Sequence, residues 1–196
     1  MSQSPKSECC GTGDRVNERH GDTRCCGNDE RPAADQSSST TRHWVLSSLR
    51  TPIGDIPVVS THLAWADHLG ASKARWRIGR MRYRVEPGLY AVGTPGPAAP
   101  VLVSANYKMS FDRLRSSVDG RDAWLLVLDT KGINVWCAAG KGTFGTDELV
   151  SRIEAVKLHD VVSTRTLILP QLGAPGVAAH EVKQRTGFRV LYGPVS

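Results

Sequence analysis

A single cysteine, Cys137, lies in the part of the chain that has apolar patterning, and its surroundings suit a large flat ligand. It sits in the run from Asn134 to Thr146, after an apolar strand pattern and just before a helix start. The small residues of this run let a planar ligand approach the backbone closely. Three roles are open for the thiol: an inert core group, a nucleophile, or a metal ligand.

Cys137 can supply only one metal ligand, and this limits the kinds of metal site in which it could take part. Zinc sites and iron–sulfur clusters need about three or four protein ligands, which one thiolate cannot provide. One thiolate can, however, be the axial ligand of a metal already held in a macrocycle. A nucleophile would need a base nearby. The histidines of this region, His159 and His180, both fall in predicted helices, where an exposed polar role is commoner.

The run Gly140-Lys-Gly142-Thr-Phe-Gly145 has the letters of the dinucleotide fingerprint G-x-G-x-x-G but not its context. In that fingerprint the first glycine follows a strand almost directly. Here the preceding apolar strand ends near Leu128, twelve residues too early. A nicotinamide site is therefore a minor alternative. A Walker A loop is rejected, because glycine follows the lysine where that motif has serine or threonine.

The composition is that of a globular protein with a basic body. Of 196 residues, 40% are hydrophobic, and the net charge is +6. Residues 1–42 carry a charge of −1, so the remainder carries +7, which indicates an anionic partner or merely a soluble basic surface. No apolar run approaches the roughly 18 residues that cross a bilayer, and the polar N-terminus is not a secretory signal. With an odd number of cysteines, five, the sequence predicts a reducing, cytoplasmic compartment.

Two regions follow from the patterning. Residues 1–41 are polar and aperiodic and are predicted to be a disordered tail. The tail holds two pairs, Cys9-Cys10 and Cys25-Cys26, which are either spectator thiols or ligands for a soft metal such as Hg(II). Residues 42–196 are predicted to be one α/β domain.

Strand and helix patterns alternate in the second half of this domain. A helix is expected over 63–76, followed by a stretch, residues 73–84, with six cations in twelve residues. Strands are expected at 89–92, 101–104, 124–128, 167–169 and 189–192, and helices at 111–118, 146–158 (with Thr146 as a cap) and 177–186 (stopped by Gly187). This alternation predicts a Rossmann-like fold with a mainly parallel sheet. A ligand then binds beyond the carboxyl ends of the strands, at the segments 104–110, 129–143, 170–176 and 193–196.

The run from Asn134 to Thr146 resembles the cap-helix signature of the corrinoid protein of the mercury-methylating pair. The segments Arg80–Tyr90, Ser104–Arg115 and Leu169–Gly176 agree, and the resemblance spans roughly residues 60–196. The domain is also similar to the cobamide-binding domain of the corrinoid iron–sulfur protein large subunit of acetyl-CoA synthesis. That relative has no cysteine at the cap-helix position, so Cys137 favours the mercury-methylating branch.

The resemblance implies a cobamide site, with cobalamin or another cobamide as cofactor. Cys137 would be the lower axial ligand of cobalt through its thiolate, and thus both the catalytic and the metal-ligating residue. The wall beneath the corrin would be formed by Val135, Trp136, Ala138, Ala139 and Gly140. The hydroxyls of Ser104 and Ser110 would bond the cofactor. The nucleotide tail would enter the loops of Gln171, Leu172, Gly173, Ala174 and Gly193.

The activity implied is a corrinoid-dependent methyltransferase. A methyl group from a folate-type donor would pass, as a carbanion equivalent, from methyl-cobalt(III) to inorganic Hg(II) and form methylmercury. A ferredoxin-like protein with [4Fe-4S] clusters would reduce cobalt again, and residues 73–84 are a candidate docking face for it; no nucleic-acid partner is expected. The alternatives are a methyl carrier of a one-carbon pathway of acetyl-CoA type and a non-catalytic cobamide-binding module.

Members of the mercury-methylating family continue into membrane helices, and no such segment is present in this sequence. We therefore expect a fragment that holds the cytoplasmic cobamide domain, with membrane attachment through a domain missing from this chain.

Overall fold

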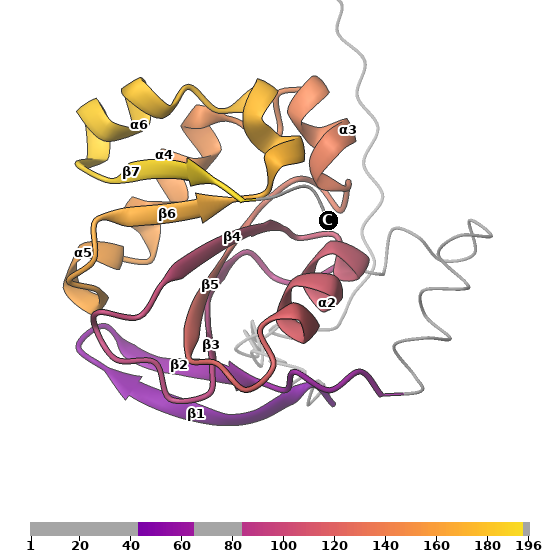
Figure 1. The fold of residues 1–196 in the computed structure, drawn as a ribbon, viewed down its shortest axis with the longest axis vertical. Helices are drawn as coiled ribbons and strands as arrows, with labels where there is room; N and C mark the ends of the chain where they lie inside the picture. The colour runs from indigo at the N-terminus through magenta and orange to yellow at the C-terminus, as the bar shows by residue number, and fades with distance from the viewer. Residues whose placement is uncertain (1–42, 65–83, 194–196) are drawn as a thin grey trace, which may run out of the picture. The chain divides into compact units, whose positions relative to one another are not determined.

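The computed structural model describes residues 43–64 and 84–193, which form one mixed sheet with helices on both faces (Figure 1). The strand order is β1-β2-β3-β5-β4-β6-β7. The strands are β1 (Val45–Thr51), β2 (Gly54–Val59), β3 (Gly88–Val92), β4 (Val101–Ala105), β5 (Ala123–Leu128), β6 (Thr166–Leu169) and β7 (Arg189–Tyr192). The helices are α2 (Lys108–Ser117), α3 (Val135–Gly140), α4 (Thr146–Ala155), α5 (Leu158–Val161), the 3₁₀ helix η2 (Gln171–Gly176) and α6 (Ala179–Thr186).

Strands β5, β4, β6 and β7 are parallel to one another, as the sequence predicts. The reason is clearest in β5, where all six residues of the sequence AWLLVL are buried, because helices cover both faces of the strand. Each of the five predicted strands is present, with ends within one residue of the expected positions. The α/β, Rossmann-like fold class is confirmed.

The N-terminal side of the sheet differs from the expected parallel arrangement. Strands β1 and β2 form an antiparallel hairpin that the sequence patterns did not predict, and β3 pairs antiparallel with β5. Eight residues, 93–100, join β3 to β4. A parallel crossover needs a dozen or more residues, so this connection is too short for one. The chain instead reverses direction, and β5 inserts between the two strands.

Two helix predictions need correction. The helix expected over 146–158 is broken, because Lys157 adopts a left-handed conformation (φ 45°) between α4 and α5. Thr146 is not the cap of α4, since Gly145 holds that position. The Thr146 hydroxyl instead accepts a hydrogen bond from the backbone N–H of Ala178 at 2.9 Å, which joins the start of α4 to the start of α6. Gly187 ends α6, as predicted, and does so in a left-handed conformation.

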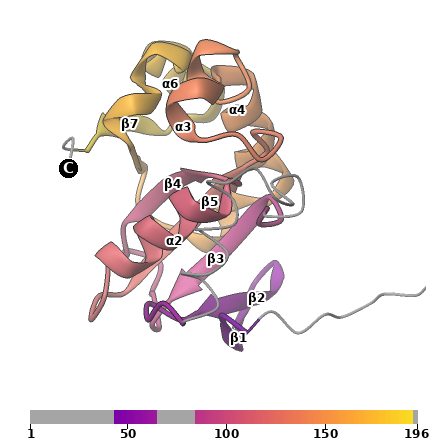
Figure 2. The ribbon, with the colours of Figure 1, turned by 90° about the vertical axis from the view of Figure 1, so that its right-hand side faces the viewer.

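The helices divide between the two faces of the sheet (Figure 2). Phe111 of α2 packs in one core with Trp44, Tyr90 and the β5 residue Val127. The second core lies on the opposite face and contains apolar residues of α4, α5 and α6. Right-handed connections that run in opposite directions, β4–α2–β5 and β6–α6–β7, account for this division. The switch in direction falls between β4 and β6.

Several sequence predictions lie outside the described residues. These are the tail of residues 1–41, most of the helix expected over 63–76, and all of the basic stretch 73–84 except Arg84.

Candidate functional site

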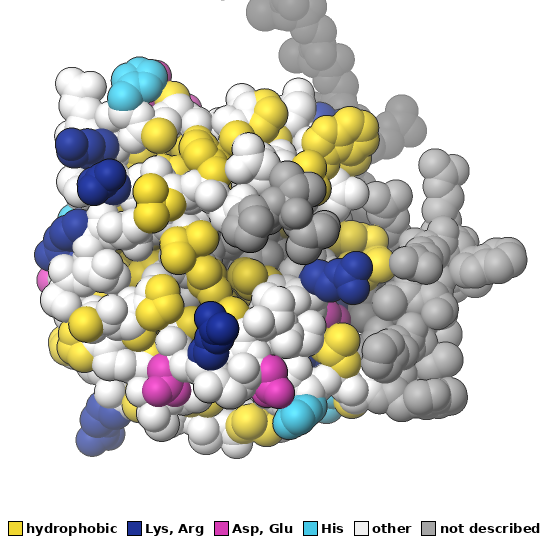
Figure 3. Space-filling model, viewed as in Figure 1, with side chains coloured by type: hydrophobic (Ala, Val, Ile, Leu, Met, Phe, Trp, Pro, Cys, Tyr) yellow, Lys and Arg dark blue, Asp and Glu magenta, His cyan; other side chains and the backbone are white. Residues whose placement is uncertain are grey.

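A cavity of about 580 Å³ opens at the switch point, above the carboxyl ends of β4 and β6. Ligands bind at this position in open α/β sheets. On the face shown in Figure 3, hydrophobic side chains gather over this part of the sheet. The lining residues come from β4, α2, the start of α3, β6, η2 and the end of β7: Leu102, Val103, Ser104, Ser110, Arg113, Leu114, Ser117, Val118, Asn134, Val135, Trp136, Ile168, Leu169, Pro170, Leu172 and Gly193.

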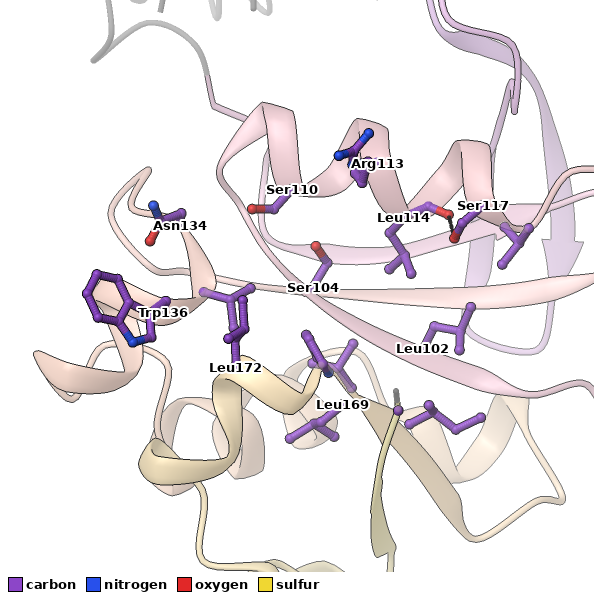
Figure 4. Close-up of a pocket in the computed structure, with 16 residues that line it drawn as sticks. Leu102, Ser104, Ser110, Arg113, Leu114, Ser117, Asn134, Trp136, Leu169 and Leu172 are labelled. Carbon is purple, nitrogen blue, oxygen red and sulfur yellow. Dashed lines mark hydrogen bonds between the residues drawn. The ribbon is translucent and has the colours of Figure 1, made fainter. Parts of the chain in front are cut away.

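The lining is apolar with a few polar groups (Figure 4). Leu102, Ile168 and Leu169 supply aliphatic surface from the two strands. Neutral polar side chains come from Asn134 and from three serines, Ser104, Ser110 and Ser117. Arg113 is the one ionisable residue of the lining. Such a cavity, mostly apolar with a few placed polar groups, is typical of a small-molecule or cofactor site.

Six of the thirteen residues predicted to bind the cofactor line this cavity: Ser104, Ser110, Val135, Trp136, Leu172 and Gly193. The other seven do not: Cys137, Ala138, Ala139, Gly140, Gln171, Gly173 and Ala174. The first group belongs to all four of the loop segments expected at the carboxyl edge of the sheet. The second group lies in the remainder of α3 and η2, next in sequence to the residues of these helices that do line the cavity.

The small residues of the cap-helix run have a packing role. Ala138 and Ala139 are buried, and α3 packs against η2. A Cβ atom at Gly176 would lie 2.1 Å from the carbonyl oxygen of Phe144 and 3.1 Å from the Cα atom of Ala139. A Cβ at Gly173 would lie 2.4 Å from the Phe144 ring. Glycine is thus required at these two positions of η2, whereas Gly140 and Gly142 of the cap-helix run have open space around them.

Cys137 lies in the first turn of α3 and is partly buried. Asn134 caps this helix, because its side-chain Oδ1 accepts a hydrogen bond from the Cys137 backbone N–H at 2.9 Å. The neighbouring Trp136 is 67% exposed, and Leu172 of η2 is 50% exposed. Two large apolar side chains of the cavity lining are therefore uncovered, and one of them, Trp136, is adjacent in sequence to Cys137.

A buried asparagine, Asn106, holds the loop that leads to α3. Its Oδ1 accepts hydrogen bonds from the Thr130 N–H (3.1 Å), the Thr130 hydroxyl (2.9 Å) and the Gly132 N–H (2.9 Å). Its Nδ2 donates to Asp129 Oδ1 at 3.1 Å. Burial alone would raise the pKa of the Asp129 carboxyl, but hydrogen bonds from Lys131 and Asn106 outweigh it and hold that pKa below its usual value. This network fixes the path from β5 to Asn134.

The sequence reasoning missed one wall of the cavity. Ser110, Arg113, Leu114 and Ser117 follow one another along α2 (Figure 4), and only Ser110 was predicted as a binding residue. Their spacing of three, four and seven residues places them on one helix face. That spacing, on a helix that directly follows a buried strand, was the available signal.

Within residues 43–64 and 84–193, no helix is long and apolar enough to span a bilayer. The same residues contain no group of three or more histidine, cysteine and acidic side chains that could hold a metal ion.

Comparisons with known proteins relate the sequence of this chain to a family. The family model of the CO dehydrogenase/acetyl-CoA synthase delta subunit matches residues 76–196. The acetyl-CoA decarbonylase/synthase complex subunit gamma of Archaeoglobus fulgidus is 35% identical over 118 residues, which are 59% of this chain and 25% of that protein. The same subunit of Methanopyrus kandleri is 31% identical over 154 residues, 76% of this chain and 33% of that protein.

A third relative, the corrinoid/iron-sulfur protein large subunit of Moorella thermoacetica, is 27% identical over 113 residues, 57% of this chain and 25% of that protein. The chain thus spans about a quarter to a third of the length of these relatives. The expected relation to the corrinoid iron–sulfur protein is confirmed, whereas membership of the mercury-methylating branch stays a prediction. Because the family model covers more than half of its residues, the chain belongs to the CO dehydrogenase/acetyl-CoA synthase delta subunit family.

Proposed function

We propose that residues 42–196 are the cobamide-binding domain of a corrinoid-dependent methyl carrier. The cavity at the switch point carries this proposal, because it joins an apolar interior to the uncovered side chains of Trp136 and Leu172. The name of the Moorella relative supports the choice of a corrinoid. When bound, a cobamide supplies a cobalt centre that takes up a methyl group and gives it up again.

The residues present fit part of a cobamide. A volume of about 580 Å³ lies within the range of small-molecule sites, about 300–1,000 Å³, and is open beside α3. The hydroxyls of Ser104 and Ser110 would bind polar groups of the cofactor, and Leu172 and Gly193 would contact its tail. Trp136 and Val135 would lie against the corrin. Cys137 does not line the cavity but lies in the helix beside it, and its thiolate would hold the cobalt.

We propose inorganic Hg(II) as the methyl acceptor. The support is the resemblance of the run from Asn134 to Thr146 to the mercury-methylating signature, together with a partly buried thiol in the helix beside the cavity. If the Cys137 thiolate held the cobalt, this electron-rich ligand would favour transfer of the methyl group to a soft cation such as Hg(II). The product would be methylmercury.

A second acceptor is favoured by the relatives, whose names place them in acetyl-CoA decarbonylase/synthase complexes. In that function the domain would carry a methyl group within a one-carbon pathway of acetyl-CoA type. Both functions share the cofactor and differ in what Cys137 contributes. Both also need a folate-type methyl donor and a reductant with [4Fe-4S] clusters, for which residues 73–84 are the proposed docking face.

An anaerobic absorption spectrum of the chain reconstituted with hydroxocobalamin tests these proposals. The unaltered chain, Cys137→Ala and a control, Cys25→Ala in the tail, would be compared. We expect a base-off spectrum with a thiolate–cobalt band that disappears in Cys137→Ala alone. Methyl transfer to Hg(II) from the pre-methylated protein should be lost in the same variant.

Three other results would change the proposal. If no cobamide binds, the corrinoid function is wrong for this chain. If Cys137→Ala binds cobamide with an unchanged spectrum, the axial thiolate is wrong. If the variant also keeps its methyl transfer to Hg(II), the reason to prefer mercury over the one-carbon acceptor is removed.

A further inference from the structure

The wall of the cavity formed by α2 carries a guanidinium group without a carboxylate partner. Arg113 lines the cavity and is exposed, and it forms no ion pair with any residue in the described part of the chain. Ser110, Leu114 and Ser117 of the same helix also line the cavity (Figure 4). A charged side chain in this position is available to a ligand.

The second arginine of α2 behaves differently. Arg115 is completely buried, and its guanidinium donates to Asp112 Oδ1 at 2.8 Å and to the carbonyl oxygen of His62 at 2.9 Å. The helix therefore uses one arginine to hold the fold and leaves the other exposed at the edge of the cavity. Because none of the lining residues is acidic, Arg113 gives the cavity a positive charge.

The chemistry of the lining selects for a particular kind of ligand. Aliphatic side chains of β4 and β6 suit an apolar ring, and the guanidinium with the Ser110 and Ser117 hydroxyls suits an anion with several acceptor oxygens. In a cobamide, one portion has both properties: the nucleotide, in which a phosphodiester carries the lower base.

We propose that Arg113 binds the phosphodiester of the cobamide and makes the chain select complete cobamides over cobinamide, which lacks the phosphodiester and the base. This inference rests on the proposed function. It makes Arg113 a residue that determines cofactor specificity, and it requires no role in the methyl transfer itself.

Equilibrium dialysis with two probes, hydroxocobalamin and aquocobinamide, tests the proposal. In Arg113→Gln we expect the dissociation constant of cobalamin to rise about ten- to hundred-fold, the usual worth of a hydrogen bond to a charged group, with cobinamide affinity unchanged. Arg113→Lys keeps the charge but not the planar fork, so it should restore part of the affinity for cobalamin.

A matched control is Arg189→Gln, which removes the same charge from an exposed position at the start of β7, the end of that strand away from the cavity. This control should bind both probes like the unaltered chain. Equal loss of both probes in Arg113→Gln, or no loss of either, would overturn the phosphodiester contact while leaving the proposed function intact. If the unaltered chain binds neither probe, the proposed function fails as well.

Discussion

Replacing Asn106 with alanine should destabilise the chain by about 2–4 kcal/mol, and the hydrogen bonds show where this cost arises. The Thr130 N–H keeps a bond to the carbonyl oxygen of Leu128 (3.1 Å), and the Thr130 hydroxyl keeps one to the carbonyl oxygen of Ile133 (2.7 Å). The Gly132 N–H has no other acceptor among the described residues. A buried donor left in this way costs about 1–3 kcal/mol, and the lost bond to Asp129 adds about 1 kcal/mol.

Urea unfolding of the unaltered chain and of Asn106→Ala measures this difference as a change in the free energy of unfolding. Amide hydrogen exchange at Gly132 should accelerate in the variant, since the lost acceptor is local. The comparison variant is Asn134→Ala, which removes a cap of α3 and should cost only about 1 kcal/mol. A loss below about 1 kcal/mol in Asn106→Ala would refute the reasoning, because the loop would then not depend on this side chain.

Three further predictions concern packing, pH and backbone strain. Gly176→Ala should destabilise by about 1–3 kcal/mol in thermal or urea unfolding, because the new Cβ meets the backbone of Phe144, whereas Gly96→Ala, with open space around it, should be close to neutral. The pKa of Asp129 is depressed in the fold, so its contribution to stability is present above the unfolded-state pKa of about 4 and is lost as the pH falls through the lower folded-state value. The stability difference between the unaltered chain and Asp129→Asn should therefore shrink in acid, and a difference that does not vary below pH ~4 would contradict it. Lys157→Gly should raise the free energy of unfolding by up to about 1 kcal/mol, because glycine adopts the left-handed conformation without strain; a decrease would show that the side chain matters more than the backbone.

The parallel half of the sheet could be predicted from the sequence, because a strand buried on both faces has a continuous apolar run such as Trp124 to Leu128. The antiparallel pairing of β3 could not be predicted from its own residues, because its five-residue sequence is compatible with either strand direction. Only the length of the loop that follows β3 determines the direction of pairing. The hairpin of β1 and β2 escaped notice because most of β1 is exposed and lacks a clear apolar alternation.

The residues of the candidate site, too, could be predicted from the sequence only in part. Residues at the carboxyl ends of strands, such as Ser104 and Gly193, could be placed from the strand pattern alone. Arg113 could not, because a polar residue on an amphipathic helix has the pattern of a solvent-facing one. Asn106 could not be predicted either, because a buried polar side chain that organises a loop leaves no periodic signal in the sequence. Its hydrogen-bond partners are more than twenty residues away in the chain.

The described residues on either side of 65–83 are both held by α2 or by the residues that lead into it. On one side, Arg115 of α2 holds the carbonyl oxygens of Ser60 and His62. On the other, Arg84 forms a β-bridge with Tyr107, and the Val85 N–H donates to the carbonyl oxygen of Asn106 at 2.9 Å. One end is thus attached to the last turn of α2 and the other to the residues between β4 and α2. Because α2 also forms a wall of the cavity, a shift of this helix would reach the cavity lining and both of these attachments together.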